Sequence, residues 1–321
     1  MKVLFITYPM AFHTPGGGEI QLLAYKRTLE KKGIQVDLFN PWEPNFLDYD
    51  VVHYFSCVGG SIHICNFIKT LGIPLVITSS LWVTEESKHL YPVDEIRHQL
   101  SMADAIVTNS DAESDELSNV LDLERAKFKT VYNGIDDVFF EEVDGSLFKD
   151  KFDIQDDFVL NVGNIESRKN QLNLVKAMHR IPNIKLVLIG HVRDSGYFEL
   201  VKSSALPSQL IYLGPLESDS ELLRAAYKAA SVFCLPSTLE TPGLAALEAM
   251  SLSCPSSVTK IGATREYFGE NIANIDPNDI ASISDSIINR LNIGNNECVS
   301  VEKFRWDTVV DDLIEVYKSV L

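Results

Sequence analysis

The sequence predicts an α/β protein of two doubly wound domains, each a mostly parallel sheet covered by helices on both faces. Three observations predict this class. The 321 residues exceed the roughly 100 to 200 residues of one typical domain. Short apolar runs alternate with amphipathic segments along the chain. This alternation restarts after an acidic, aperiodic stretch at residues 141–157. We therefore expect domains at residues 1–145 and 155–303.

The first half alternates strands and helices. Val3–Thr7 is a continuous apolar run that ends before a glycine cluster, as a buried parallel strand does. Glu19–Lys32 follows as an amphipathic helix, and Gly33 stops it. Further strands are expected at Val36–Phe39, Asp50–Phe55, Leu75–Thr78, Ala105–Thr108 and Val131–Tyr132.

The second half repeats this order of elements. Open α/β sheets bind ligands at the carboxyl ends of their strands, so the loops after strands should carry the chemistry. Strands are expected at Phe158–Val162, Lys185–Gly190, Leu210–Gly214, Ser231–Leu235 and Ser256–Thr259, and helices at Gln171–His179, Ser218–Ala230 and Gly243–Ser251.

Charge and hydropathy exclude several partners. The net charge of −17 opposes binding to nucleic acid. The basic residues Lys26, Arg27, Lys31 and Lys32 leave peripheral contact with a membrane open, although a solvated helix face is the ordinary interpretation. No apolar run has the length of a signal peptide or a membrane span. We expect a cytoplasmic protein, or one at the inner face of the membrane.

Neither cysteines nor histidines have metal-binding spacing. The seven histidines are interpreted as ordinary loop or core residues, with His13 beside the glycine cluster the main exception. Asp48–Asp50 precedes a strand and is interpreted as a solvated loop. We therefore expect no metal, no disulfide and a reducing compartment. The five scattered cysteines are Cys57, Cys65, Cys234, Cys254 and Cys298.

A glycine-rich turn at residues 15–19 joins the first strand to the first helix. Exposed amides and the helix dipole favour a phosphate there, and a merely flexible turn is the alternative. Gln21 stands where a dinucleotide fingerprint needs its third glycine, which disfavours NAD or NADP even though Asp37 is near the usual ribose-binding spacing.

Arg168 and Lys169 lie in the loop after the strand Phe158–Val162. In an acidic protein, two adjacent cations at the carboxyl end of a strand favour a diphosphate clamp, with Arg binding through its fork and Lys as a point charge. By themselves, two neighbouring basic residues are more often ordinary surface.

Residues 238–250 carry the strongest local signal in the chain. Thr241 is a good N-cap, and Pro242 follows at the first helical position. Glu248 is the only charged residue between Thr241 and Thr259, and lies on an apolar helix. Such a carboxylate needs a hydrogen-bonding partner, either a ligand diol or amide, or an ion pair or cap within the fold.

This segment resembles the GT-B glycosyltransferases, specifically glycosyltransferase family 4. That family has two glutamates eight residues apart, usually followed by Ala-Met, and Glu240, Glu248 and Ala249–Met250 match this pattern. The resemblance implies two Rossmann-like domains facing across a cleft, with a terminal helix at 304–321 packing back onto the first. Other matching landmarks are Glu19 in its glycine turn, Asp50–His53, Asn109–Ser110, Asn133–Asp136, Val162–Gly163, Gly214–Leu216, Glu266, Asp276–Pro277 and Phe304–Trp306.

The resemblance also implies site roles. Glu248 would hold the ribose of a nucleotide, Glu240 would face the donor sugar, and Arg168 and Lys169 would neutralise the diphosphate. The catalytic set is then Arg168, Lys169 and Glu240. The remaining donor contacts would come from Gly17, Gly18, Gly163, Leu216, Thr241, Gly243 and Leu244.

The implied activity is transfer of a hexose from a nucleotide diphosphate sugar to a saccharide or lipid-linked acceptor, with retention at the anomeric carbon, in surface polysaccharide or glycoconjugate synthesis. Fixed cations and amides would stabilise the leaving group without a metal or other cofactor. A catalytically silent nucleotide-sugar-binding protein is the main alternative, and a GT-B phosphorylase or epimerase is another.

Several positions depart from the family pattern. Ser79–Ser80 stands where a histidine is expected after the strand Leu75–Thr78, so the acceptor side is assigned to His13, Ser80 and Trp82. Asn164 replaces an arginine that often follows the family's Val-Gly. These departures motivate the catalytically silent alternative.

Overall fold

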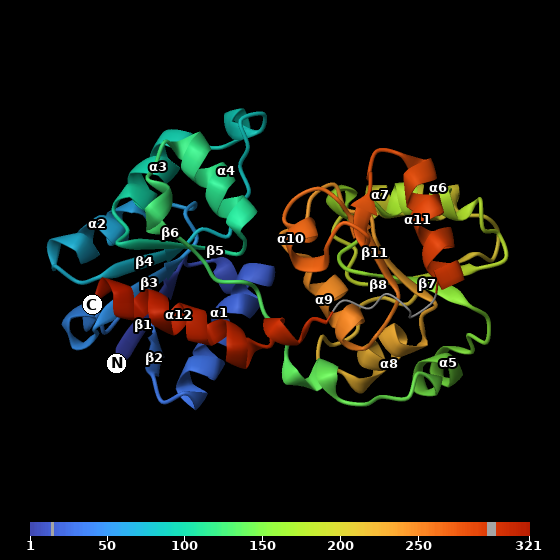
Figure 1. Cartoon of the computed structure of the whole chain (residues 1–321), viewed down its shortest axis with the longest axis horizontal. Helices are drawn as coiled ribbons and strands as arrows, with labels where there is room; N and C mark the ends of the chain where they lie inside the picture. Colours follow the sequence, from blue (N-terminus) through green and yellow to red (C-terminus); the bar gives the residue numbers. More distant parts are fainter. Residues whose placement is uncertain (14–15, 294–299) are drawn as a thin grey trace. The chain divides into compact units, whose positions relative to one another are not determined.

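The computed structural model describes residues 1–13, 16–293 and 300–321, and the chain forms two compact units (Figure 1). The first unit comprises Met1–Gly134 and Phe304–Leu321, and the second comprises Ile135–Lys303. The chain thus enters the second unit well before the expected boundary at residue 145. The reason is that α5 (Ser146–Phe152) and the short helix Asp137–Phe140 pack against second-unit helices.

Six parallel strands form the sheet of the first unit, in the order β2-β1-β3-β4-β5-β6. The last strand is Phe128–Thr130, not the expected Val131–Tyr132, because the ladder with β5 runs opposite Ile106–Thr108 and ends at Thr130. The strands are β1 Lys2–Thr7, β2 Gln35–Leu38, β3 Val51–Phe55, β4 Leu75–Thr78, β5 Ala105–Thr108 and β6 Phe128–Thr130. The helices are α1 Gly17–Lys31, α2 Ile62–Thr70, α3 Val93–Ser101, α4 Asp111–Leu121 and α12 Trp306–Val320.

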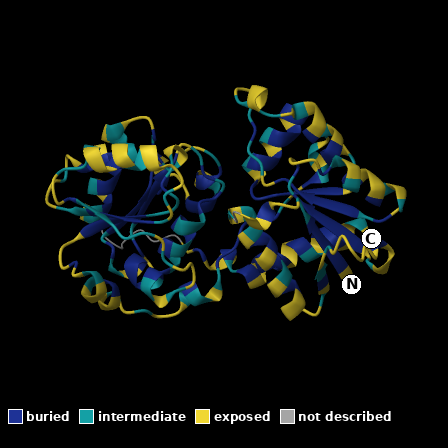
Figure 2. Cartoon of the chain, turned by 180° about the vertical axis from the view of Figure 1, so that it is seen from behind, coloured by how far each residue is buried: buried dark blue, intermediate teal, exposed yellow. Residues whose placement is uncertain are grey.

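Both faces of this sheet are covered, which explains its continuous apolar strands. Buried side chains of α2, α3 and α4 pack on one face. Those of α1 and α12 pack on the other, so the carboxyl-terminal helix belongs to the core of the first unit. Figures 1 and 2 show these layers and the buried strands between them.

Helix α12 is held by specific contacts as well as by apolar burial. The Trp306 ring lies over Gly134, where a Cβ atom would come within 2.3 Å of it. His53 Nδ1 lies 2.6 Å from the Tyr317 hydroxyl oxygen, and its Nε2 lies 2.7 Å from Thr78 Oγ1. Burial lowers the pKa of His53 to about 3, so the imidazole is neutral at physiological pH.

The second unit has a sheet of the same kind, in the order β12-β11-β10-β7-β8-β9. Strand β12 was not expected from the sequence because its three residues, with the exposed Asn274 in the middle, form no continuous apolar run. The strands are β7 Phe158–Val162, β8 Lys185–Ile189, β9 Leu210–Tyr212, β10 Val232–Leu235, β11 Ser256–Thr259 and β12 Ala273–Ile275. The helices besides α5 are α6 Gln171–Met178, α7 Ser195–Ser204, α8 Glu221–Ala229, α9 Leu244–Ser251, α10 Thr264–Phe268 and α11 Ile280–Ile293.

Two helix-covered parallel sheets confirm the predicted α/β doubly wound class. Within the described ranges, no helix combines the length and apolar character needed to cross a bilayer.

Candidate active site

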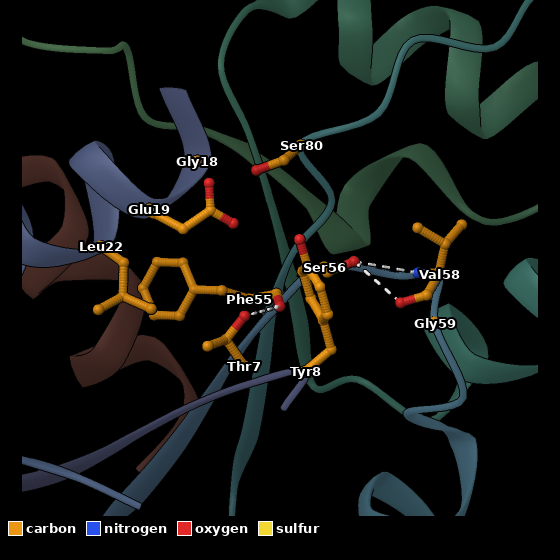
Figure 3. A pocket seen from close by; sticks show the side chains of 10 residues that line it. All are labelled: Thr7, Tyr8, Gly18, Glu19, Leu22, Phe55, Ser56, Val58, Gly59 and Ser80. Carbon is orange, nitrogen blue, oxygen red and sulfur yellow. Dashed lines mark hydrogen bonds between the residues drawn. The ribbon is translucent and has the colours of Figure 1, made fainter. Parts of the chain in front are cut away.

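A cavity of about 290 Å³ lies in the first unit, where β1, β3 and β4 end and α1 begins (Figure 3). This is the sheet edge at which doubly wound folds bind ligands. The polar side chains that line it are Thr7, Tyr8, Glu19, Ser56 and Ser80.

The start of α1 forms one wall of the cavity. Gly16 has an extended backbone and is the N-cap, and its N–H donates to Glu19 Oε2 at 2.7 Å. Gly17 and Gly18 are the first helical residues, and Gly18 lines the cavity. Burial, together with the Glu19 carboxylate, raises the pKa of Tyr8 across the cavity. Thr14 and Pro15 of the predicted turn lie outside the described residues.

Ser79 and Ser80, which replace the expected histidine, have different environments. Ser79 is buried, and its Oγ donates to Glu113 Oε1 at 2.6 Å. Ser80 lines the cavity with φ of +46°, a left-handed conformation unusual for serine. The Leu81 N–H also donates to Glu113 Oε1, at 3.4 Å, so Glu113 holds the residues on both sides of Ser80.

Glu113 was missed by the sequence reasoning. Its side chain is buried in α4, and its Oε2 accepts the Asn109 N–H at 2.9 Å. Burial raises the pKa of Glu113 to about 7, and the hydrogen bonds from Ser79, Asn109 and Leu81 offset only part of that rise. The Ser110-x-x-Glu113 spacing is a capping-box signal that could have pointed to this residue.

Of the three residues assigned to the acceptor side, Ser80 lines this cavity. His13 is exposed at the end of a short helix, and Trp82 is partly exposed in the loop after β4. Neither is among the residues that line the cavity.

The second unit brings together the predicted catalytic residues Arg168, Lys169 and Glu240. Lys169 Nζ lies 2.6 Å from Glu240 Oε1, and Arg168 Nη1 lies 3.7 Å from the same oxygen. Burial by itself would raise the pKa of Glu240, but the charges of Lys169 and Arg168 outweigh it and the pKa is lowered. Glu240 is therefore an ionised, nearly inaccessible carboxylate that holds the two cations.

Glycine backbone packs closely beside these cations. A Cβ atom on Gly163, at the end of β7, would lie 3.4 Å from Lys169 Cε. A Cβ atom on Gly190, after β8, would lie 1.9 Å from the Gly163 carbonyl oxygen. Only glycine fits at position 190, and the lysine side chain packs over the backbone at Gly163.

Helix α9 begins later than expected. Its first residue is Leu244, and Gly243 with φ of +93° takes the N-cap position without a side-chain cap. The prediction of Thr241 as N-cap and Pro242 as first helical residue is therefore wrong, because the left-handed Gly243 separates both from the helix. The Thr241–Pro242 peptide bond is cis.

Glu248 has a protein partner. The Tyr227 hydroxyl of α8 donates to Glu248 Oε2 at 2.7 Å, a contact that sequence reasoning did not foresee. Burial, and to a smaller extent the charge of Asp136, raises the pKa of Glu248 to about 7. Leu216, predicted to contact the base, is partly exposed in the loop after β9.

No group of His, Cys, Asp and Glu suited to a metal ion occurs in the part of the chain that the structure describes. Cys57, Cys65, Cys234 and Cys254 are buried free thiols, and Cys298 lies outside the described residues.

These two units define a GT-B glycosyltransferase fold. The HepE protein of Anabaena, crystallised in complex with UDP, superimposes with a TM-score of 0.80 at 18% identity, covering 99% of this chain and 100% of that one. Residues 142–319 match the family described as glycosyl transferases group 1, and residues 43–139 match glycosyltransferase family 4. Because the first match spans more than half of the chain, this protein belongs to the glycosyl transferases group 1.

Two curated relatives agree with this assignment. An uncharacterized glycosyltransferase of Methanocaldococcus jannaschii is 27% identical over 85% of this chain and 76% of its own. The D-inositol 3-phosphate glycosyltransferase of Mycolicibacterium smegmatis is 22% identical over 87% of this chain and 69% of its own.

Proposed function

We propose that this protein transfers a hexose from a nucleoside diphosphate sugar to a saccharide or lipid-linked acceptor, with retention at the anomeric carbon. The observation that carries the proposal is the buried Glu240 carboxylate holding Lys169 and Arg168 at the carboxyl edge of the second sheet. Complexes of the structurally similar HepE protein with UDP and with UDP-glucose support a nucleotide sugar as donor.

The chemical task of this cluster is to stabilise the leaving group. Negative charge develops on the nucleoside diphosphate as the glycosidic bond breaks, and fixed cations stabilise it without reorganisation. Lys169 is already oriented by Glu240 and by packing against Gly163, so little side-chain freedom is lost when the diphosphate binds. Amide groups around Gly243 and Leu244 would face the sugar.

Glu248 would accept hydrogen bonds from the ribose hydroxyls. Its carboxylate is joined by one hydrogen bond to Tyr227 and therefore has acceptor capacity left for a diol. Gly17 and Gly18, at the start of α1, would offer amides to the diphosphate.

Retention follows if the acceptor attacks from the face that the leaving group vacates. The acceptor oxygen forms the new bond to the anomeric carbon while the bond to the diphosphate breaks, and the departing phosphate takes the acceptor's proton. No protein nucleophile and no metal are needed in this scheme. We place the reaction in polysaccharide or glycoconjugate synthesis, in the cytoplasm or at the inner face of the membrane.

The test is incubation of the full chain with a panel of nucleotide sugars and acceptors, with NMR to read the anomeric configuration. Lys169→Gln should lower kcat at least about a hundredfold, as removal of a group that stabilises the transition state does. Lys176→Gln, an exposed lysine on α6, is the control and should not change it. The absence of both transfer and hydrolysis with every donor would contradict the proposal. Nucleotide binding without turnover would identify the silent alternative.

A further inference from the structure

Arg193 lies in the loop that follows β8, at the same edge of the second sheet as Arg168 and Lys169. The parallel strands β7 and β8 are neighbours, and their pairing continues beyond their ends. The Ile165 N–H donates to the His191 carbonyl oxygen at 2.8 Å, and the Arg193 N–H donates to the Ile165 carbonyl oxygen at 3.2 Å. The backbone of Arg193 is therefore fixed beside the loop that carries the two cations.

The side chain of Arg193 has a neutral partner. In the amide orientation that gives both groups a hydrogen bond, the Asn164 side-chain oxygen accepts from Arg193 Nε at 3.1 Å and from Nη2 at 3.3 Å. An amide has no net charge, so it orients the guanidinium without neutralising it. Arg193 Nη1 lies 3.7 Å from Glu166 Oε2, which is too long for a hydrogen bond. Within the described part of the chain, Arg193 therefore keeps N–H groups that can donate to a ligand.

Two carboxylates link Arg193 to Arg168 and Lys169. Glu166 lies between the two arginines, with its Oε1 3.2 Å from Arg168 Nη2 and its Oε2 facing Arg193. Glu240 in turn joins Arg168 to Lys169. Three cations thus alternate with two carboxylates along one edge of the sheet, and the group as a whole carries one net positive charge.

The carboxylates are sheltered, whereas the arginines face solvent. The side chains of Glu240 and Glu166 are 6% and 19% exposed, and those of Arg168 and Arg193 are 48% and 47% exposed. The neighbouring Asp194 is the N-cap of α7. An anion from solution therefore meets the guanidinium groups, while the carboxylates behind them hold these groups in place. The fork of an arginine matches the geometry of phosphate oxygens.

We propose that Arg193 is a phosphate-binding residue, and that it forms with Arg168 and Lys169 a three-cation site for a diphosphate. Its use in sugar transfer rests on the proposed function, whereas diphosphate binding does not. Asn164, which stands where an arginine often follows the family's Val-Gly, holds an arginine supplied by the neighbouring loop. The charge lost from position 164 is thus replaced from position 193.

The experiment is isothermal titration calorimetry of the full chain with two probes. These are UDP and inorganic pyrophosphate, which carries a diphosphate without a base or a sugar. Arg193→Asn should weaken the binding of each probe at least about tenfold, as the loss of one charged hydrogen-bonding group does. Because this side chain is half-exposed, the midpoint of urea denaturation should remain that of wild type.

An exchange variant separates the effect of charge from that of loop structure. Arg193→Asn combined with Asn164→Arg moves the guanidinium to the other side of the hydrogen bond and keeps the net charge of the chain. It should restore the affinity to within about threefold of wild type. Arg180→Asn is the matched control. The Arg180 side chain is 49% exposed and paired with Asp285 near the amino end of β8, so its replacement should not alter diphosphate binding.

The inference is overturned if wild type binds neither probe, or if Arg193→Asn binds them as tightly as wild type. A loss of affinity that the exchange variant does not restore also overturns it, because Arg193 would then act through the structure of its loop. Turnover with the donor panel is measured in parallel. Diphosphate binding that depends on Arg193, without transfer or hydrolysis, counts against the proposed function alone. Turnover by a wild type whose diphosphate affinity does not depend on Arg193 counts against the inference alone.

Discussion

Glu113 is a buried carboxylate and Glu248 a half-buried one, and the pKa of each is raised to about 7. Burial is the main cause in each case, because desolvation disfavours the charged form. Their partners differ: Glu113 accepts from a serine and two backbone amides, whereas Glu248 accepts from one tyrosine. The first therefore has its hydrogen-bonding capacity used within the fold, and the second has capacity left for a ligand.

At Glu248, the proposed ribose contact predicts a pH dependence of UDP binding. The ionised carboxylate accepts hydrogen bonds from both hydroxyls. The affinity for UDP should therefore be constant well above pH 7 and decrease below it, with a slope that approaches about tenfold per pH unit. Calorimetry from pH 5.5 to 8.5 measures this. Glu248→Gln is the reference, because the phosphate of UDP titrates equally in both proteins. The same pH profile in wild type and variant would contradict the ribose role.

At Glu113, the raised pKa predicts an effect on stability. The folded pKa of about 7 exceeds the ordinary 4.5, so the stabilisation is complete below pH 4.5 and is lost as the pH rises to 7. Glu113→Gln does not titrate. The difference between the free energies of unfolding of the variant and of wild type should therefore increase by about 2 to 3 kcal/mol in favour of the variant from pH 5 to pH 8.

Chemical denaturation at the two pH values measures this relative gain. Glu116→Gln, a less buried residue of the same helix, serves as the control and should show no such change. A difference between Glu113→Gln and wild type that does not vary with pH would contradict the interpretation.

Among elements, the strand ends position the cation cluster. β7 and β8 approach so closely after their last residues that Gly190 has no room for a side chain. Gly163 lies between that contact and Lys169. A change at Gly190 should therefore be transmitted through the Gly163 backbone to the side chain of Lys169.

We predict that Gly190→Ala lowers the free energy of unfolding by about 2 to 4 kcal/mol, through steric overlap and backbone strain. It should also lower transfer activity in the protein that remains folded, since the Gly163 carbonyl must move. Urea denaturation and steady-state kinetics measure the two effects. Gly33→Ala is the control: Gly33 also has positive φ, but no atom lies within 4 Å of its new Cβ, so the change should cost only about 1 kcal/mol. Equal losses for both variants would contradict the packing argument.

On the scale of the whole molecule, the first unit is built from two distant parts of the chain. Helix α12 covers one face of its sheet, and Trp306 packs on Gly134 and Tyr25, with ring centroids of the two aromatic residues 5.5 Å apart. The unit is therefore incomplete without residues that follow the second unit in sequence.

Trp306→Ala should destabilise the first unit by about 3 to 5 kcal/mol, the usual cost of removing a large aromatic side chain from a core. Trp42→Ala is the control, because Trp42 is in the same unit but 89% exposed, and it should change stability little. Thermal unfolding followed by circular dichroism compares them. If both variants melt like wild type, α12 does not contribute to the core as described.

Local patterns were sufficient for the fold class and for most elements. The strand at residues 158–162 follows from its apolar run, and the end of α1 at Lys31 follows from the nearby Gly33. In both cases the cause lies within a few residues of the element. The glutamate pair and the adjacent cations were also recognisable along the chain. Short β12 and the start of α9 were not, because pairing with a neighbour and the left-handed Gly243 decide them.

The sequence by itself determined two helix-covered parallel sheets and the candidate residues Arg168, Lys169, Glu240 and Glu248. Only the tertiary structure decided their partners. Lys169 and Glu240 are 71 residues apart and meet because β7 and β10 are neighbours in one sheet. Hydrogen bonds and ion pairs depend on distances of a few ångströms, and for residues so far apart in sequence those distances are set by packing of the whole unit.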